Sequence, residues 1–206
     1  MIKKITFGLF VIFISTTVNA QWWENGKRIK GNGNIVTVKR TTSNYDGIGV
    51  GGSFDVKLVK GKEGNITIEG EENIIPYIET EVKGNTLEIK YKKNTNISTT
   101  RKLTVTVTYS ELDKVSLGGS GNITNEGVLK SDDLKVSLGG SGNITLVLDV
   151  DEVKSSIGGS GNIKLNGKSN QLNCSIAGSG SIKAYDLTTE TLNATIAGSG
   201  SIRTTV

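Results

Sequence analysis

The chain has 206 residues, a formal net charge of +4, no histidine, one cysteine and one proline. The lack of histidine excludes Ser-His-Asp triads, histidine general acid–base catalysis and histidine-ligated metal sites. A single cysteine, Cys174, excludes an intrachain disulfide, so packing and backbone hydrogen bonds must stabilise the fold.

The first twenty residues predict a signal peptide. Lys3 and Lys4 precede the apolar run 5–14, and Val-Asn-Ala at 18–20 resembles a signal-peptidase site. The apolar run is too short to span a bilayer as a stable helix, and a retained N-terminal anchor is the alternative. No cysteine stands directly after the cleavage point, where Gln21 follows Ala20, which argues against a lipoprotein anchor. We therefore expect export to the periplasm, the outer-membrane surface or the medium, with no transmembrane segment after processing.

The mature chain would begin with residues 21–36, which include Trp22 and Trp23 and which we expect to be disordered. Loss of two lysines from the signal peptide lowers the formal charge from +4 to +2. The remaining chain has the length of one domain with a full core. No stripe of Lys and Arg interleaved with aromatic residues follows, so no nucleic-acid partner is expected.

Residues 37–110 predict irregularly spaced strands. Gly84-Asn85 and the glycines of 61–64 mark turns. A short helix within 71–80 is favoured by the shared face of three isoleucines and opposed by Pro76. We interpret this half as the wide, irregular opening coils of the same domain as the repeats that follow, with a separate β-domain as the alternative. Apolar and polar residues alternate, as in strands with one buried face, at 54–58, 65–68, 86–91 and 103–109.

Residues 111–206 repeat one glycine-rich turn about every twenty positions. The leading apolar residues of the copies are 21, 19, 19 and 20 positions apart. Apolar and polar residues alternate around each turn, and no copy leaves room for a helix, so the repeat predicts the coils of a parallel β-helix. The copies read LGGSGNI at 117–123 and 138–144, IGGSGNI at 157–163, IAGSGSI at 176–182 and 196–202, with a divergent VGGSFDV at 50–56.

Stacking of the coils gives each residue type of the repeat a structural role. Coils roughly 4.8 Å apart place equivalent residues in columns, and asparagines in one column form a ladder of side-chain hydrogen bonds. Glycines allow adjacent corners to approach closely. The predicted interior columns are Leu117, Leu138, Ile157, Ile176 and Ile196, and Ile123, Ile144, Ile163, Ile182 and Ile202. The predicted structural turn residues are Gly118, Gly119, Gly121, Asn122, Gly139, Gly140, Gly142, Asn143, Gly158, Gly159, Gly161, Asn162, Gly178, Gly180, Gly198 and Gly200.

The order of these segments resembles the bacterial head GIN domain, a family labelled as an auto-transporter adhesin domain. The resemblance covers residues 39–202 and is carried by YDGIGVGGSFDV at 45–56, EENI at 71–74, TLEI at 86–89 and the tandem Gly-Ser-Gly turns. It implies a right-handed parallel β-helix over 37–206. It carries over no catalytic residue, and it implies surface adhesion only through the family label.

Catalytic and cofactor motifs are not supported by the sequence, and no cofactor is expected. Cys174 falls in the interior column of Val115, Val136, Ser155 and Ala194, and no base accompanies it, so a buried inert thiol is predicted. The Gly-x-Gly turns precede no helix, as a phosphate-binding loop would require. They also lack the period and the aspartate of calcium-binding nonapeptide repeats.

One cluster of carboxylates suggests a metal. Alignment of neighbouring coils places Asp132 and Asp133 in register with Asp151 and Glu152, with Asp149 nearby. Stacked carboxylates repel one another, and calcium would neutralise them through oxygen ligands. The alternative is a solvated corner neutralised by Lys130 and Lys154.

These features predict an exported, non-enzymatic surface or envelope protein that binds a glycan, an envelope component or a protein. The alternative is a polysaccharide-active β-helix enzyme, for which the corner of Asp132 and Glu152 is the candidate groove. The last coil would expose unpaired backbone groups. We expect its edge at 204–206 to be covered, either by folding over or by a second copy of the chain.

Overall fold

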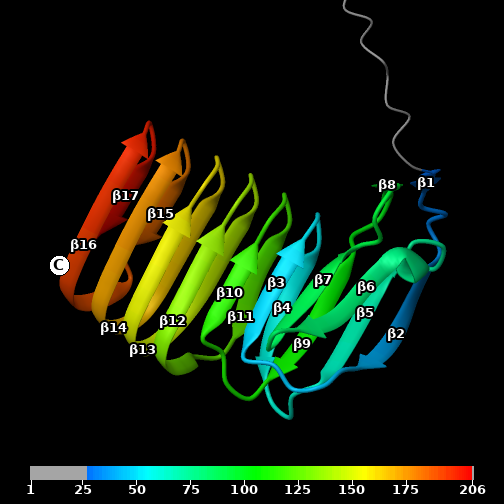
Figure 1. Cartoon of the computed structure of the whole chain (residues 1–206), viewed down its shortest axis with the longest axis horizontal. Coiled ribbons are helices and arrows are strands. Elements are labelled where there is room, and N and C mark those ends of the chain that lie inside the picture. Colours follow the sequence, from blue (N-terminus) through cyan, green and yellow to red (C-terminus); the bar gives the residue numbers. More distant parts are fainter. Residues whose placement is uncertain (1–26, 206) are drawn as a thin grey trace, which may run out of the picture.

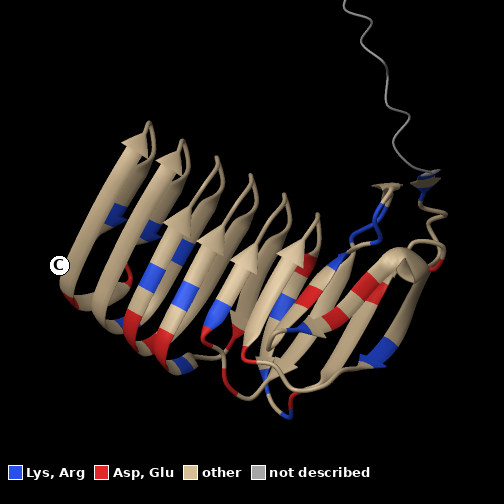
Figure 2. Ribbon diagram, viewed as in Figure 1, with Lys and Arg blue, Asp and Glu red and all other residues tan. Residues whose placement is uncertain are grey.

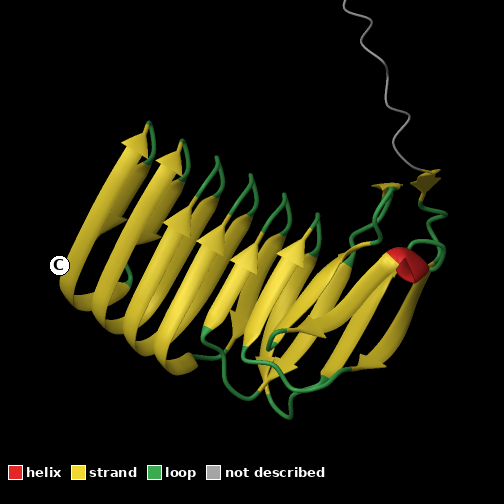
Figure 3. Ribbon diagram, viewed as in Figure 1, coloured by secondary structure: helices red, strands yellow, loops and turns green. Residues whose placement is uncertain are grey.

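The computed structural model describes residues 27–205, so the predicted signal peptide, Trp22 and Trp23 lie outside the described residues. The predicted all-β class is confirmed, because strands joined by loops and one short helical turn make up the described chain (Figure 3). In this part of the chain no helix has the length and hydropathy of a membrane span. The elements are β1 (Lys27–Lys30), β2 (Ile35–Thr41), β3 (Gly47–Gly51), β4 (Asp55–Lys60), β5 (Asn65–Glu71), the 3₁₀ turn η1 (Ile75–Tyr77), β6 (Ile78–Lys83), β7 (Thr86–Tyr91), β8 (Thr95–Ser98), β9 (Thr104–Tyr109), β10 (Lys114–Leu117), β11 (Asn122–Glu126), β12 (Leu129–Leu138), β13 (Asn143–Ile157), β14 (Asn162–Gly178), β15 (Ser181–Ala184), β16 (Leu187–Gly198) and β17 (Ser201–Thr204).

One sheet contains fifteen of these strands, and β1 and β8 form a separate parallel pair. The large sheet curls, so that two portions face each other across the core (Figure 1). The long strands take part in both portions. The first half of β13 pairs with β11, and its second half pairs with β12. The curl therefore arises where a single strand bends from one portion into the other.

Strands of the repeated half pair in parallel and in the register that the sequence predicts. Leu117 pairs with Leu138, Leu138 with Ile157, and Ile157 with Ile176 and onward to Ile196. The isoleucine column from Ile123 to Ile202 is likewise continuous. The register of both predicted columns is confirmed, and their members are buried except in the last coil, where Ile196 is exposed and Ile202 is half-buried. Period-two alternation leaves only one register that buries the apolar face.

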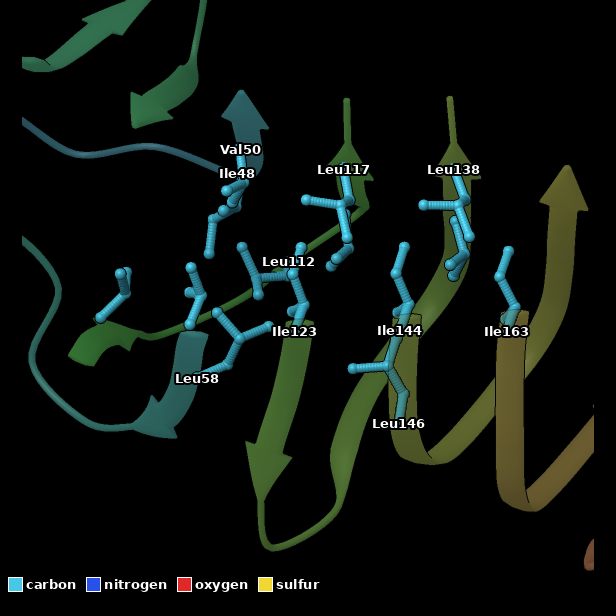
Figure 4. Packing of buried hydrophobic residues seen from close by; sticks show 14 of the residues in the cluster. Ile48, Val50, Leu58, Leu112, Leu117, Ile123, Leu138, Ile144, Leu146 and Ile163 are labelled. Carbon is cyan, nitrogen blue, oxygen red and sulfur yellow. The ribbon is translucent and has the colours of Figure 1, made fainter. Parts of the chain in front are cut away.

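The core fills the space between the two portions of the sheet. Figure 4 shows Leu117 and Leu138 pointing toward Ile123 and Ile144, which come from the opposite portion. Each of these four side chains is almost fully buried. Burial of a side chain of this size contributes about 1.5–3 kcal/mol, so the stacked columns are the main source of stability.

The predicted asparagine ladder is present on the outer surface of the descending strands. Asn143 Nδ2 donates to Asn122 Oδ1 at 2.9 Å, and Asn162 Nδ2 donates to Asn143 Oδ1 at 3.0 Å. Asn122 continues the chain of bonds to Asp55, and Ser181 continues it from Asn162. The ladder thus links successive coils through side chains, in addition to the backbone bonds.

Two kinds of glycine stand in each turn. A Cβ on Gly140 would overlap the carbonyl oxygen of Gly119 in the preceding coil, and Gly159 meets Gly140 in the same way. In contrast, a Cβ on Gly139 or Gly158 would have no other atom within 4 Å. Close stacking of the turns therefore requires the second glycine of each Gly-Gly pair, and the first is spatially permissive.

The prediction of one parallel β-helix over 37–206 is not confirmed, because the sheet is mixed and only curled. In the first half β2 pairs antiparallel with β5, β5 with β9, and β6 with β7. The connection from β6 to β7 explains one of these pairs. Gly84 and Asn85 both have positive φ, 52° and 61°, and a two-residue loop of this kind produces an antiparallel hairpin. The opening coils are therefore partly hairpins. Of the helix expected within 71–80, only the turn at Ile75–Tyr77 forms.

The segment 21–36, which we expect to be disordered, contains ordered structure from residue 27 onward. Residues 27–30 form β1, and Ile29 is buried. The buried carboxylate of Glu71, at the end of β5, holds the loop between β1 and β2 in place. It accepts hydrogen bonds from the N–H of Gly33 at 2.7 Å and from the N–H and Oγ1 of Thr100 at 2.8 and 2.6 Å. One acidic side chain thus ties the β1–β2 connection to the β8–β9 connection.

The last coil of the described residues differs from the coils before it. Strands β16 and β17 pair on one side only, with β14 and β15. Ile176 is almost fully buried, whereas Ile196, the next residue of the same column, is 45% exposed. The described residues after β17 therefore leave Ile196 uncovered, and the fold-over expected at 204–206 is not seen as far as residue 205.

Candidate binding groove at the corner of the curled sheet

Strands β12 and β13 bend at the corner opposite the Gly-Ser-Gly turns (Figure 1). The buried–unburied alternation of β13 breaks at Asp151 and Glu152, two successive residues that are both unburied. In β12 the corresponding run of unburied residues is longer, extends from Lys130 to Asp133, and ends in the adjacent exposed pair Asp132 and Asp133. Two successive outward residues shift the alternation by one, which lets the strand turn the corner and still keep its apolar side chains inside.

A surface cavity of about 500 Å³ lies at this corner. Its walls carry charge of both signs, and Figure 2 shows acidic and basic segments gathered along the bent ends of the strands. Val150 is the one apolar side chain among the described residues that line it. The lining residues are Lys60, Glu111, Lys130, Ser131, Asp132, Asp149, Val150 and Asp151. We call this cavity the corner groove.

The corner groove is partly neutralised by its own residues. Lys130 Nζ lies 2.9 Å from Asp149 Oδ2, and both side chains remain about half exposed or more. The hydrogen bond and charge of Lys130 hold the pKa of Asp149 below its ordinary value. Asp151 accepts a hydrogen bond from Asn170 Nδ2 at 3.0 Å. No hydrogen bond to the side chain of Asp132 from a described residue is present, so this carboxylate is available to a ligand.

The other acidic residue of each corner pair faces a different cavity. Asp133 and Glu152 pair in register, as predicted, and line a cavity of about 210 Å³. Glu152 Oε2 lies 2.8 Å from Lys154 Nζ, and Glu152 Oε1 accepts from Asn173 Nδ2 at 2.7 Å. The hydrogen bond from Lys154 to Glu152 raises the pKa of that lysine. The two members of each adjacent pair are both outside the core, but they line different cavities on either side of the bend.

The candidate calcium ligands therefore do not converge. Asp132 and Asp151 line the corner groove, whereas Asp133 and Glu152 line the smaller cavity. Across residues 27–205, no three side chains of His, Cys, Asp or Glu lie close enough together to hold a metal ion. Lysine and asparagine donors already contact Asp149, Asp151 and Glu152. This geometry favours the alternative of a lysine-neutralised corner.

Cys174 is a structural residue, as the sequence predicts. It pairs with Ser155 on one side and Ala194 on the other, and it is 4% exposed. Burial raises the pKa of its thiol to about 12. The thiolate required for nucleophilic attack or metal binding is therefore disfavoured at neutral pH.

Two residues of the corner groove lie outside the predicted acidic cluster. Lys60 ends β4, and Glu111 precedes β10, so the fold brings them to the corner from other coils. No motif marks either residue in the sequence. The pairing of β4 with β11 and of β11 with β13 could have suggested Lys60, because it continues the divergent 50–56 copy of the repeat.

Fold and groove together define an all-β protein with repeated strands and an open, polar surface groove in place of an enclosed pocket. The chain belongs to the family described as "putative auto-transporter adhesin, head GIN domain", whose profile matches residues 44–206. The resemblance carried by the turns and by segments 45–56, 71–74 and 86–89 is thereby confirmed. Curated proteins provide no sequence match.

Solved structures share the fold at low sequence identity. A structure named as a putative adhesin from Bacteroides fragilis NCTC 9343 superposes with a TM-score of 0.75 at 20% identity, covering 86% of this chain and all of the other. A structure named as a putative lipid binding protein from Parabacteroides distasonis ATCC 8503 superposes with a TM-score of 0.67 at 23% identity. The match covers 87% of this chain and 100% of the other. A structure named as a putative adhesin from Parabacteroides merdae ATCC 43184 superposes with a TM-score of 0.63 at 21% identity. The match covers 87% of this chain and 99% of the other. These similarities extend over most of the fold.

Proposed function

We propose that this protein is an exported, non-enzymatic surface or envelope protein that binds a hydrophilic ligand, such as a glycan, in the corner groove. The observation that carries the proposal is the polar lining of an open cavity of about 500 Å³. Lysine ammonium groups, carboxylates and the Ser131 hydroxyl can donate and accept hydrogen bonds in several directions, as a hydroxyl-rich ligand requires. The adhesin description of the family supports the same function.

A lipid ligand is less consistent with this groove. One solved relative in fold is named as a putative lipid binding protein. An acyl chain requires an apolar lining, because burial of apolar surface drives its binding. Val150 is the single apolar residue among the described residues of the corner groove. A neutral or mixed-charge glycan fits the lining better.

Glycan binding by the mature chain, residues 21–206, tests the proposal. We expect retention of a subset of glycans on a glycan array, and loss of that retention in Asp132→Ala. Asp133→Ala is the matched control, since the two adjacent aspartates face different cavities. Circular dichroism confirms that both variants fold. Absence of any glycan binding by the wild type, or equal loss in the control, would refute the groove as a glycan site.

A polysaccharide-active enzyme is the second candidate. The observation in its favour is that the corner groove brings Asp132, Asp151 and Lys60 to the same cavity. General acid–base cleavage of a glycosidic bond uses carboxylates positioned on either side of it. A screen for polysaccharide degradation, with and without calcium, separates the two candidates. Degradation that disappears in Asp151→Ala would replace the adhesin proposal with an enzymatic one.

We also infer that the repeated half winds as a right-handed parallel β-helix. Parallel pairing at steps of 19 to 21 residues from β10 through β12, β13, β14 and β16 supports this inference. An export signal at 1–20 is proposed from the same sequence pattern that predicted it. N-terminal sequencing of the protein recovered from the periplasm or medium should then begin at Gln21.

A further inference from the structure

One outward-facing column becomes basic in the last three coils. The column lies two residues beyond the asparagine ladder. Its first members after Lys57 are Thr124 and Thr145. It continues in register through Lys164, Lys183 and Arg203. Figure 2 shows basic segments at equivalent heights on the neighbouring strands of this end of the sheet. We call Lys164, Lys183 and Arg203 the basic row.

The charge of the basic row is poorly neutralised within the described residues. Adjacent strands lie roughly 4.8 Å apart, and like charges directly opposite each other on neighbouring strands are destabilising. Lys164 Nζ lies 3.5 Å from Asp186 Oδ2. Neither Lys183 nor Arg203 forms an ion pair with another described residue.

Two lysines near the corner of the sheet have close carboxylate partners. Lys130 meets Asp149 at 2.9 Å, and Lys154 meets Glu152 at 2.8 Å. The basic row thus differs from the corner groove, where the protein supplies anions of its own. An external anion with regularly spaced charges would offset the repulsion along the row.

The surroundings of the basic row suit a sugar polymer. Ser181 and Ser201 form the adjacent column on one side and present hydroxyl groups. Tyr185 directly follows the end of β15, two positions beyond Lys183, and is 53% exposed. A tyrosine ring offers a flat apolar surface with a polar hydroxyl, which can contact a sugar ring and its substituents.

We propose that the basic row of Lys164, Lys183 and Arg203 binds a linear acidic polysaccharide that runs across β14, β15 and β17. In-register pairing makes the row straight, so successive negatively charged sugars can meet successive cations. An anionic membrane is a poorer match, because insertion requires several apolar side chains. Among the described residues, none of the large exposed hydrophobic side chains lies on β14, β15 or β17. The site is distinct from the corner groove and does not depend on it.

Binding of the mature chain to polygalacturonate, with dextran as the neutral probe, tests this proposal. We expect wild type to bind polygalacturonate and not dextran. The affinity should fall as salt rises from about 0.01 M to about 1 M, which shortens the screening length from about 30 Å to about 3 Å. In the double variant Lys183→Ala/Arg203→Ala the affinity should fall roughly tenfold or more, since two charge-assisted contacts are lost.

The double variant Lys114→Ala/Lys135→Ala is the matched control. It removes two cations that are also in register on neighbouring strands, but from the other portion of the sheet. It should retain wild-type affinity, and so should the groove variant Asp132→Ala, which separates this proposal from the proposed function. The proposal is overturned by equal loss in both double variants, by equal binding to dextran, or by binding only to anionic phospholipid vesicles.

Discussion

Asn143 and Asn122 occupy the same position in successive coils, and the side-chain nitrogen of the first donates to the side-chain oxygen of the second at 2.9 Å. Asn143 also accepts from Asn162 at 3.0 Å. Its side chain therefore takes part in two inter-coil hydrogen bonds, and the position gives a direct measure of what the ladder contributes.

Asn143→Ala should lower the free energy of unfolding by about 1–3 kcal/mol, because each net hydrogen bond is worth about 0.5–1.5 kcal/mol. Thr145→Ala is the control. Thr145 lies on the same outer surface of β13, and its hydroxyl has no side-chain hydrogen bond to a described residue. Urea unfolding of both variants provides the comparison. Equal destabilisation would show that the ladder adds no specific stability.

Adjacent glycines of one turn should respond differently to substitution by alanine. Gly140→Ala places a methyl group against the carbonyl oxygen of Gly119, so it should destabilise by about 1–3 kcal/mol, as overpacking does. Gly139→Ala meets no atom within 4 Å and should be neutral, or stabilise by up to about 1 kcal/mol through the unfolded chain. Thermal unfolding of the two variants measures both. A loss of stability at Gly139 as large as that at Gly140 would contradict the stacking argument.

The regular half of the fold was predictable because two independent patterns agree. The turn fixes which coils are equivalent, and the alternation fixes which side chains are buried, so Leu138 and Ile157 have only one possible register. The antiparallel strands of the first half lack such a repeat. The dipeptide Gly84-Asn85 indicates a turn in the sequence. The positive φ values of both residues, which make this turn a two-residue hairpin loop, are known only from the folded chain.

The candidate site was predictable only in part. Aligned coils place Asp133 beside Glu152, and this register is confirmed. The same alignment cannot show that the strand bends between Asp132 and Asp133 and separates them into two cavities. Lys60 and Glu111 reach the corner groove from distant parts of the chain through the tertiary structure. Only the divergent repeat copy at 50–56 hints at Lys60, and local sequence patterns contain no signal for Glu111.

Acidification should weaken the fold through Glu71. Burial alone would raise the pKa of this carboxyl, but hydrogen bonds from Thr100, Gly33 and Arg101 together lower it below its ordinary value of 4.5. A folded-state pKa below the unfolded value contributes stability above about pH 4.5. That contribution is lost as pH falls through the folded-state pKa.

Unfolding by urea between pH 7 and pH 3 tests this linkage. Glu71→Gln should destabilise the fold at pH 7 and show a smaller further loss on acidification than wild type. Glu72→Gln is the control, because Glu72 is exposed and its side chain accepts one hydrogen bond, from Asn34. Parallel pH profiles for wild type and Glu71→Gln would contradict the role assigned to Glu71.

Calcium should leave the melting temperature unchanged. A cation that binds the folded state stabilises it in proportion to the logarithm of its concentration over Kd. The carboxylates at the corner are divided between two cavities, and Lys130 and Lys154 already contact Asp149 and Glu152. The melting temperature is measured by thermal unfolding with and without millimolar calcium, and magnesium is the control cation. A rise specific to calcium that is absent in Asp151→Ala would restore the metal hypothesis.

A second copy of the chain should cover strand β16. This strand pairs with β14 on one side, and its Ile196 is 45% exposed in a column whose earlier members are buried. Its last residues carry no charge that would protect the edge, and an unprotected edge pairs readily with another strand. A twofold axis would join two such edges in antiparallel pairing and bury both copies of Ile196.

Light scattering of the mature chain should therefore give the mass of a dimer, and Ile196→Lys should give a monomer, because a buried lysine at the interface would be unpaired. Ile35→Lys is the matched control, since Ile35 is exposed to a similar extent, 43%, on a strand at the other end of the sheet. The control should remain dimeric. A wild-type monomer whose β16 backbone amides exchange rapidly with solvent would rule out the second copy.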